Sequence, residues 1–338
     1  MGLSERFILR CGMAYNLAAM TVRVRSFAKI NLGLSIGAVR EDGFHELLTV
    51  YQTIGLHDVM RVSVGRGSGI EIQCDDPRVP KDESNTCYRI VEKVMPALNA
   101  RGHVVIDIEK RLPVQGGLGG ASANAVTTLF ALERVLRKTL PARERLRIAA
   151  EVGSDLPLFL LGGTVLGVGR GEQVYALGDL PATACVVVTP KVGVSTPDAF
   201  ARWDRKLTMP GASDRMVELG RGLSAWLSEV YSGAPRSFVQ PRRGRAENPL
   251  LELVRAGIKN DFEQVVFPEY PELSEGKCAL ERAGAKYASL SGSGSTLYGL
   301  FVSKEAARTA AARLRRQGWA AQATVTVTRR AYWKGVLG

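Results

Sequence analysis

The sequence contains few cysteines and histidines, the residues that bind zinc or form disulfides. Its 338 residues include 5 cysteines and 3 histidines, which lie far apart and form no Cys-x-x-Cys pair. Zinc ligands are usually closely spaced, and a disulfide framework usually has an even number of cysteines. The pattern argues against both, and it is typical of reduced thiols in a cytoplasmic protein.

Long hydrophobic runs are also missing. The uncharged apolar stretch 156–169 is interrupted by Pro157 and several glycines, and it is shorter than the roughly 18 apolar residues of a spanning helix. We therefore expect no membrane association. Residues 1–19 lack the apolar core and cleavage site of a secretory signal. We expect them to be weakly ordered, with Met13 and Met20 as alternative translation starts to Met1.

Positive charge predominates, with 45 Lys+Arg against 33 Asp+Glu and a net charge of +12. An excess of this size predicts an anionic partner. Charge alone does not distinguish nucleic acid, a membrane surface and a polyphosphate metabolite as that partner. Aromatic residues make up 7%, and none lies within the Arg-rich clusters 242–245 and 308–316. Because a base-stacking surface needs such aromatics, nucleic acid is not favoured.

The chain length suggests about two domains. Strand patterns occur at 22–36, 48–56, 59–64, 70–73, 104–109, 164–168, 173–177, 184–189, 287–290, 296–302 and 322–328. Helical patterns occur at 85–100, 121–137, 142–152, 197–204, 215–231, 250–267, 273–283 and 304–316. Residues 232–248 resemble an exposed loop. Strands and helices do not alternate strictly, which argues against a doubly wound parallel sheet and favours an α+β fold.

The glycine-rich stretch Gly116–Gly120 leads directly into a predicted helix. Glycines let the backbone approach a ligand closely, and the first helical N–H groups have no intrahelical partner, so the junction can bind an anion. Ser122 could donate to a phosphate or help to hold a metal ion. The stretch is neither a Walker A loop nor a dinucleotide fingerprint. Phosphate binding is favoured over a flexible connector.

Other polar residues are ambiguous when each is taken alone. The segment Leu290–Leu297 is either a hairpin turn or a place where another segment or a phosphate comes close. Lys29 and Asn31 alternate in an apolar strand, as residues on a solvated face do. Asp155 is either a helix N-cap or turn residue or a catalytic group, and His45 could be a turn-exposed imidazole.

Taken together and in order, these segments resemble the GHMP kinases, a family named for galactokinase, homoserine kinase, mevalonate kinase and phosphomevalonate kinase. The resemblance runs from about residue 21 to residue 319. The matching motifs are Phe27–Leu32, Arg40–Leu47, Leu112–Ala125, Gly153–Phe159 and Leu290–Gly294.

The resemblance implies a two-domain α+β GHMP kinase fold, with a ribosomal protein S5 domain 2-like N-terminal half and a ferredoxin-like C-terminal half. The expected divisions are a weakly ordered extension at 1–19, an ATP- and substrate-binding domain at 20–185 and a C-terminal domain at 186–330.

The resemblance also implies a catalytic pair. Asp155 would take or orient the proton of the acceptor hydroxyl, and Lys29 would align that hydroxyl and neutralise developing charge. The loop would wrap the phosphates of ATP, with Mg²⁺ bridging the β- and γ-phosphates through ligands that the sequence leaves open. The implied ATP-binding residues are Asn85, Lys110, Pro113, Gly116, Gly117, Leu118, Gly119, Gly120 and Ser122.

Within the family, the motifs are most similar to those of kinases for a cytidine diphosphate-linked polyol in isoprenoid biosynthesis. Phe44 and Phe200 would then sandwich a cytosine whose edge hydrogen-bonds to His45. The implied substrate-binding residues are Asn31, Phe44, His45, Thr196, Phe200, Gly292 and Gly294. The expected protein is a cytoplasmic monomer or homodimer. The alternatives are a homoserine or mevalonate type of kinase and a non-catalytic anion-binding protein.

Some positions depart from the family pattern. Gln115 replaces a loop glycine, Ala123 removes one of two adjacent hydroxyls, and Phe44 replaces a tyrosine. Ser291 and Ser293 replace threonines. None of these changes removes the expected catalytic pair, so we expect an active enzyme.

Overall fold

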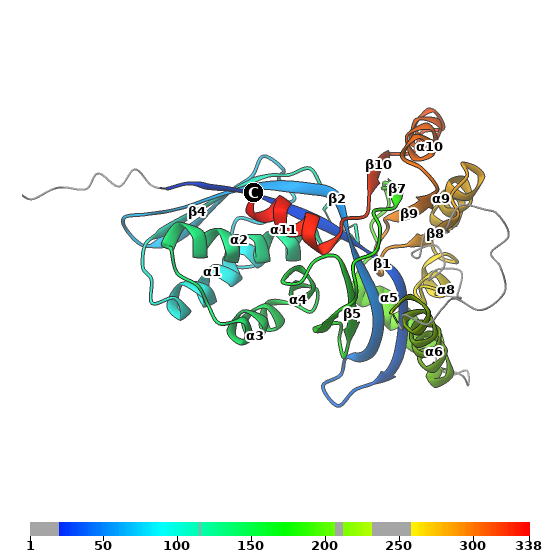
Figure 1. Cartoon of the computed structure of the whole chain (residues 1–338), viewed down its shortest axis with the longest axis horizontal. Helices are drawn as coiled ribbons and strands as arrows, with labels where there is room; N and C mark the ends of the chain where they lie inside the picture. Colours follow the sequence, from blue (N-terminus) through cyan, green and yellow to red (C-terminus); the bar gives the residue numbers. More distant parts are fainter. Residues whose placement is uncertain (1–19, 115, 207–211, 232–257) are drawn as a thin grey trace, which may run out of the picture.

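The computed structural model describes residues 20–114, 116–206, 212–231 and 258–338 (Figure 1). The extension predicted at 1–19 and the loop predicted at 232–248 lie outside these residues. The described chain forms two β-sheets with helices packed on them, as the α+β prediction requires. In this part of the chain, no helix is both long and apolar enough to cross a membrane.

The first sheet is built around one long antiparallel pair, β1 (Val22–Val39) and β2 (His45–Gly65). Its order is β3-β4-β2-β5-β6, with β1 added to β2. The other strands are β3 (Gly69–Gln73), β4 (His103–Glu109), β5 (Thr164–Val168) and β6 (Gln173–Ala176).

The break predicted between strands 48–56 and 59–64 is wrong, because β2 runs continuously through it. The polar residues there are accommodated inside the sheet. The ring of His57 lies 5.3 Å from that of Phe27, and Asp58 is fully buried.

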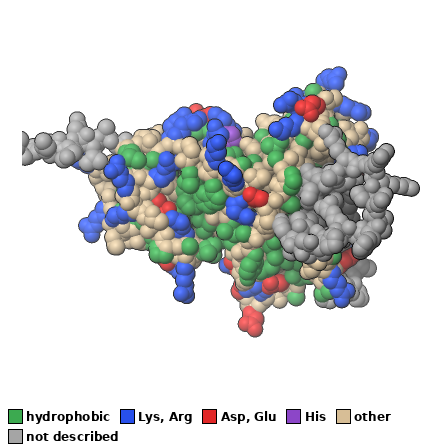
Figure 2. Space-filling view, viewed as in Figure 1, with side chains coloured by type: hydrophobic (Ala, Val, Ile, Leu, Met, Phe, Trp, Pro, Cys, Tyr) green, Lys and Arg blue, Asp and Glu red, His purple; other side chains and the backbone are tan. Residues whose placement is uncertain are grey.

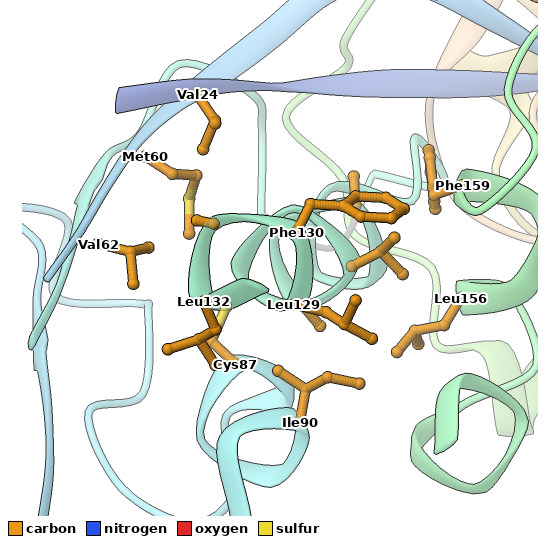
Figure 3. Close-up of a cluster of buried hydrophobic side chains, with 14 of the residues drawn as sticks. Val24, Met60, Val62, Cys87, Ile90, Leu129, Phe130, Leu132, Leu156 and Phe159 are labelled. Atoms are coloured by element: carbon orange, nitrogen blue, oxygen red, sulfur yellow. The ribbon is translucent and has the colours of Figure 1, made fainter. Parts of the chain in front are cut away.

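Helices cover one face of this sheet. They are α1 (Thr86–Ala97), α2 (Gly120–Leu136), α3 (Ala142–Val152) and α4 (Leu156–Phe159). Helix α2 carries few charges and lies between the sheet and α1, where Leu129, Phe130 and Leu132 pack against Met60 and Ile90 (Figure 3). Full burial of such a side chain stabilises the fold by about 1.5–3 kcal/mol. The buried helix therefore gives the glycine-rich loop at its start a fixed support.

The second sheet has the order β10-β7-β9-β8. Its strands are β7 (Ala184–Val188), β8 (Tyr287–Leu290), β9 (Leu297–Phe301) and β10 (Ala321–Val325). The helices of this half are α5 (Thr196–Lys206), α6 (Ala212–Tyr231), α8 (Glu263–Val266), α9 (Pro271–Arg282) and α10 (Lys304–Arg316). The boundary predicted near residue 185 falls within β7.

The helix predicted at 250–267 is wrong in its described part, where only α8 is helical. The chain before α8 instead runs beside β1 and forms an isolated bridge between Asn260 and Leu34. The carboxylate of Asp261 accepts a hydrogen bond from the backbone N–H of Ile36 at 2.9 Å. These contacts across the fold outweigh the local helical pattern.

The C-terminal helix α11 (Arg329–Leu337) was not predicted, and it packs back onto the first half of the chain. Its Tyr332 hydroxyl donates to the Phe159 carbonyl at 2.6 Å, and the Tyr332 ring lies 5.7 Å from that of Phe27. Tyr332 and Val336 are both buried and four residues apart, which was the available sequence signal.

Basic side chains are spread over both halves of the face shown in Figure 2, with hydrophobic side chains between them. On this face they do not form the single basic stripe that is typical of nucleic-acid-binding domains.

Candidate active site

A cavity of about 390 Å³ lies at the start of α2. It contains all the predicted ATP-binding residues and Asp155. Its lining is Arg78, Val79, Pro80, Ser84, Asn85, Thr86, Ile108, Lys110, Pro113, Val114, Gly116, Gly117, Leu118, Gly119, Gly120, Ala121, Ser122, Asn124 and Asp155.

The shape of the glycine loop depends on left-handed backbone conformations that glycine adopts readily. Gly117 has φ of 75° and Gly119 has φ of 68°. Gly119 is also the N-cap of α2 and makes no side-chain capping bond, so the first-turn N–H groups are available to a ligand. The N–H of Lys29 donates to the Leu118 carbonyl at 2.9 Å, which fixes the loop on β1.

The N-termini of two helices meet at this cavity. The Thr86 hydroxyl, at the start of α1, donates to the Ala121 carbonyl in the first turn of α2 at 2.9 Å. The positive ends of both helix dipoles therefore favour an anion here. Asn85 caps α1 by accepting from the Cys87 N–H at 2.8 Å and donating to the Pro80 carbonyl at 2.6 Å. Asn85 thus shapes the cavity wall by holding the backbone at Pro80 and at the start of α1.

Lys29 and Asp155 meet beside the glycine loop. Lys29 Nζ lies 3.2 Å from Asp155 Oδ2, and the two side chains are 4% and 34% exposed. Lys29 Nζ also donates to Asn31 Oδ1 at 2.7 Å. The β1–β2 register shifts between Phe27 and Lys29, with the extra residues on β2. The alternative of a solvated face is therefore wrong for Lys29 and Asn31, which are both buried.

Asp155 occupies the N-cap position of α4, in a turn, as one alternative predicted, but its side chain makes no capping hydrogen bond. The carboxylate is therefore available to the cavity. The Tyr51 hydroxyl donates to Asp155 Oδ1 at 3.1 Å, so Oδ1 has a hydrogen bond and Oδ2 has the ion pair with Lys29. Burial, followed by the charge of Asp155, raises the pKa of Tyr51 well above its ordinary value, and Tyr51 therefore stays a proton donor.

Tyr51 was not among the predicted site residues. The sequence offered only a weak signal, a tyrosine in a predicted strand. In the structure, Tyr51 lies opposite Asn31 in the β1–β2 pairing. Two glycines make room for the ring. A Cβ at Gly167 would lie 2.5 Å from Tyr51 Cε2, and one at Gly171 would lie 2.4 Å from its hydroxyl oxygen.

The segment 290–297 is a hairpin between β8 and β9, and it also packs against the phosphate loop. The Ser291 hydroxyl donates to the Gly117 carbonyl at 3.0 Å, and a Cβ at Gly294 would lie 2.6 Å from the Gly117 nitrogen. A Cβ at Gly292 would lie 3.5 Å from Lys29 Nζ. Both interpretations of this segment are thus correct.

Asn260 holds this second glycine loop and was also missed. Its Nδ2 donates to the carbonyls of Leu290 and Gly292 at 2.9 and 2.8 Å, while its Oδ1 accepts from the Phe262 N–H at 3.0 Å. Asn260 was not predicted as a site residue because it lies within the segment 250–267, for which a helix was predicted.

His45 is buried, so the turn-exposed alternative is wrong. Its Nδ1 lies 3.0 Å from the Gly37 carbonyl, and its Nε2 lies 2.7 Å from Asp204 Oδ1. The imidazole stacks on Phe200 with centroids 5.3 Å apart and an interplanar angle of 9°. The structure thus brings α5 against the start of β2.

The two rings of the predicted sandwich have other partners in this structure. Phe44 is 54% exposed, and the Arg170 guanidinium lies 4.9 Å from its ring centroid. Phe200 contacts His45 and, edge to face at 4.9 Å, Phe262. Thr196, at the start of α5, hydrogen-bonds Ser293 through their hydroxyls at 2.7 Å.

Among the described residues, no group of three or more His, Cys, Asp or Glu side chains could hold a metal ion. Asp155 and Ser122 nevertheless line the same cavity. Mg²⁺ commonly takes one or two carboxylates together with substrate phosphates and water. This donor set therefore fits a Mg²⁺ ion that is shared with a bound polyphosphate.

Comparison with protein families agrees with this geometry. Residues 85–163 match the model described as GHMP kinases N terminal domain, and residues 246–320 match the model described as GHMP kinases C terminal.

Individual relatives are similar over most of their length. The chain is 37% identical over 283 residues to a 4-diphosphocytidyl-2-C-methyl-D-erythritol kinase of Solibacter usitatus, covering 84% of this chain and 82% of the relative. It is 34% identical to the protein of the same name from Caldanaerobacter subterraneus, covering 83% and 88%.

Solved structures show the same fold. The crystal structure of a 4-(cytidine 5'-diphospho)-2C-methyl-D-erythritol kinase matches with a TM-score of 0.68 and 29% identity, over 90% of this chain and 99% of that one. A homoserine kinase from Cytophaga hutchinsonii matches with a TM-score of 0.68 at 20% identity, over 91% and 95%.

Proposed function

The chain belongs to the 4-diphosphocytidyl-2-C-methyl-D-erythritol kinase family of the GHMP kinases, and from this premise we propose its reaction. The protein transfers the γ-phosphoryl group of ATP to the 2-hydroxyl of 4-diphosphocytidyl-2-C-methyl-D-erythritol, a step of isoprenoid precursor biosynthesis. The observation that carries the proposal is the 3.2 Å pair of Lys29 and Asp155 beside the glycine-lined cavity.

The cavity binds ATP with its phosphates at the start of α2. The unpaired N–H groups of the first turn and the dipoles of both helices face the negative charge. Pro113, Val79 and Ile108 provide apolar wall for the base. Asp155 and Ser122 would hold a Mg²⁺ ion, which supplies charge neutralisation between the β- and γ-phosphates.

Asp155 receives or orients the proton of the acceptor hydroxyl. Phosphoryl transfer depends mainly on positioning and charge stabilisation, and this pair can supply both. Tyr51 donates to one carboxylate oxygen and the Lys29 ammonium forms an ion pair with the other, which holds the carboxylate in place. Asn31 holds the ammonium from the other side. The Lys29 charge also stabilises the negative charge on the transferring group.

The acceptor lies between this pair and α5. The residues proposed to bind it are Asn31, Phe44, His45, Thr196, Phe200, Gly292 and Gly294. His45 Nε2 is paired with Asp204 in this structure. A hydrogen bond from His45 Nε2 to the cytosine edge therefore has to replace this contact or be formed alongside it. We retain the proposed domains 20–185 and 186–330, action in the cytoplasm, and a monomer or homodimer.

The test is ADP release by the purified protein with 4-diphosphocytidyl-2-C-methyl-D-erythritol, homoserine and mevalonate as separate acceptors. We expect turnover with the first, and a new phosphomonoester signal in the ³¹P NMR spectrum of the product. Turnover with only homoserine or mevalonate would assign the chain to another activity of this fold. Salt-sensitive binding of nucleic acid without any kinase activity would support a non-catalytic protein instead.

A further inference from the structure

Asp58 is a fully buried carboxylate at the end of the phosphate loop, and the mechanism above does not use it. Its Oδ1 accepts from the backbone N–H groups of Arg111 and Leu112 at 2.8 and 2.7 Å. Its Oδ2 accepts from Lys110 Nζ at 2.6 Å and from Asn124 Nδ2 at 3.0 Å.

These donors come from both sides of the glycine loop. Arg111 and Leu112 lie a few residues before it, whereas Asn124 lies in α2, after it. One side chain on the long strand β2 thus ties the entry and the exit of the loop to the same point of the first sheet. Lys110 and Asn124 also line the nucleotide cavity, so Asp58 sets the direction of two polar groups there.

Only a charged acceptor explains this arrangement well. A carboxylate without exposed surface is costly to bury unless it is paired and hydrogen-bonded. Here a cation and three neutral donors compensate it. An apolar residue would leave two backbone N–H groups and a buried ammonium without this acceptor. Close packing alone would not require a buried charge here, next to two residues that line the nucleotide cavity.

We propose that Asp58 is the positioning residue of the nucleotide site, which holds the phosphate loop in the conformation that binds ATP. This inference rests on the proposed function for its ligand, ATP, and it assigns Asp58 no contact with the reacting atoms. Its loss therefore acts on nucleotide affinity through the loop and not on the acceptor.

The experiment measures binding of β,γ-imido-ATP with Mg²⁺ by calorimetry, and KM for ATP and for the acceptor, in Asp58→Ala and Asp58→Asn. We expect Asp58→Ala to raise Kd and the KM for ATP about 10- to 100-fold, the effect of losing hydrogen bonds to a charged group. The KM for the acceptor should stay within about twofold. Asp58→Asn should have a smaller effect, with Kd and the KM for ATP raised only about fivefold, because its amide oxygen still accepts from both backbone N–H groups.

Glu133→Gln is the matched control. Glu133 is a buried carboxylate near the other end of α2, where it accepts from the Leu140 N–H at 2.7 Å and pairs with Arg145 at 2.8 Å. Its substitution should lower stability without changing nucleotide affinity.

Unchanged Kd in the folded Asp58 variants, or an equal loss in Glu133→Gln, would overturn the proposal. If Asp58→Ala does not fold, the Kd of Asp58→Asn for the ATP analogue decides whether the proposal holds. Calorimetry needs no acceptor, so absence of turnover in the unaltered protein would refute the proposed function and leave this inference standing.

Discussion

Replacement of Asp155 by asparagine tests the catalytic pair with the smallest change of shape. The Tyr51 hydroxyl can still donate to the amide oxygen, as it does now to Asp155 Oδ1 at 3.1 Å. The amide nitrogen, however, would face Lys29 Nζ at the present separation of 3.2 Å, and both groups are donors. The variant thus loses both the proton acceptor and the countercharge of a buried ammonium.

The catalytic effect should be large. General-base assistance contributes about 10²–10⁴-fold to a rate, which corresponds to about 2.7–5.4 kcal/mol of barrier. The loss of stability should be smaller. Breaking a fully buried ion pair costs about 3–5 kcal/mol, but Asp155 is 34% exposed, and water can solvate the site. We therefore expect a loss of only about 1–2 kcal/mol.

The assay is coupled ADP release at saturating acceptor, with ATP varied. We expect kcat to fall by about 10²–10⁴-fold while KM for ATP changes little, because the loop that binds the phosphates is untouched. Tyr51→Phe is the comparison variant. It keeps the carboxylate and loses one hydrogen bond, so its rate should fall by about tenfold or less.

Normal turnover in Asp155→Asn would refute proton acceptance by Asp155. An equally deep loss in Tyr51→Phe would show that the phenol, and not the carboxylate alone, is essential to the chemistry. Urea unfolding of both variants checks that the loss of activity does not reflect loss of the fold.

Two further predictions follow from the backbone and from the buried thiols. Gly117→Ala should raise KM for ATP at least about tenfold, because its Cβ would lie 2.2 Å from the Ser291 carbonyl oxygen. Gly284→Ala, which has φ of 100° and open space around it, should cost about 1–2 kcal/mol of stability and leave KM unchanged; equal kinetic effects would contradict the argument. Burial raises the pKa of Cys87 and of Cys185 from 9.0 to about 12. The unfolded thiols ionise first, so each contribution to stability is complete below pH 9 and is lost towards pH 12, by about 1.4 kcal/mol per pH unit. Urea unfolding between pH 9.5 and 11 should therefore show a shallower decline in Cys87→Ala than in the unaltered protein, and identical slopes would contradict it.

The phosphate loop was predictable from the sequence because its chemistry is local. Glycines that precede a helix determine both the backbone conformation and the free N–H groups, so the loop at 116–120 and Ser122 could be identified without any distant contact. The continuity of β2 was not predictable in this way. The polar pair His57 and Asp58 looked like a strand end, and only the partners of these residues across the fold show why β2 continues through a half-buried His57 and a buried Asp58.

The sequence by itself determined the residue types, the glycine loop and the order of motifs that resemble the GHMP kinases, because each is encoded within a few consecutive positions. Only the tertiary structure decided that Lys29 meets Asp155, that Tyr51 holds the second carboxylate oxygen and that Asp58 ties both ends of the loop. These pairs are separated by about a hundred residues or by a strand and a helix. Side chains so far apart along the chain come together only when the strands pair and α2 packs beneath them, since no local rule relates their positions.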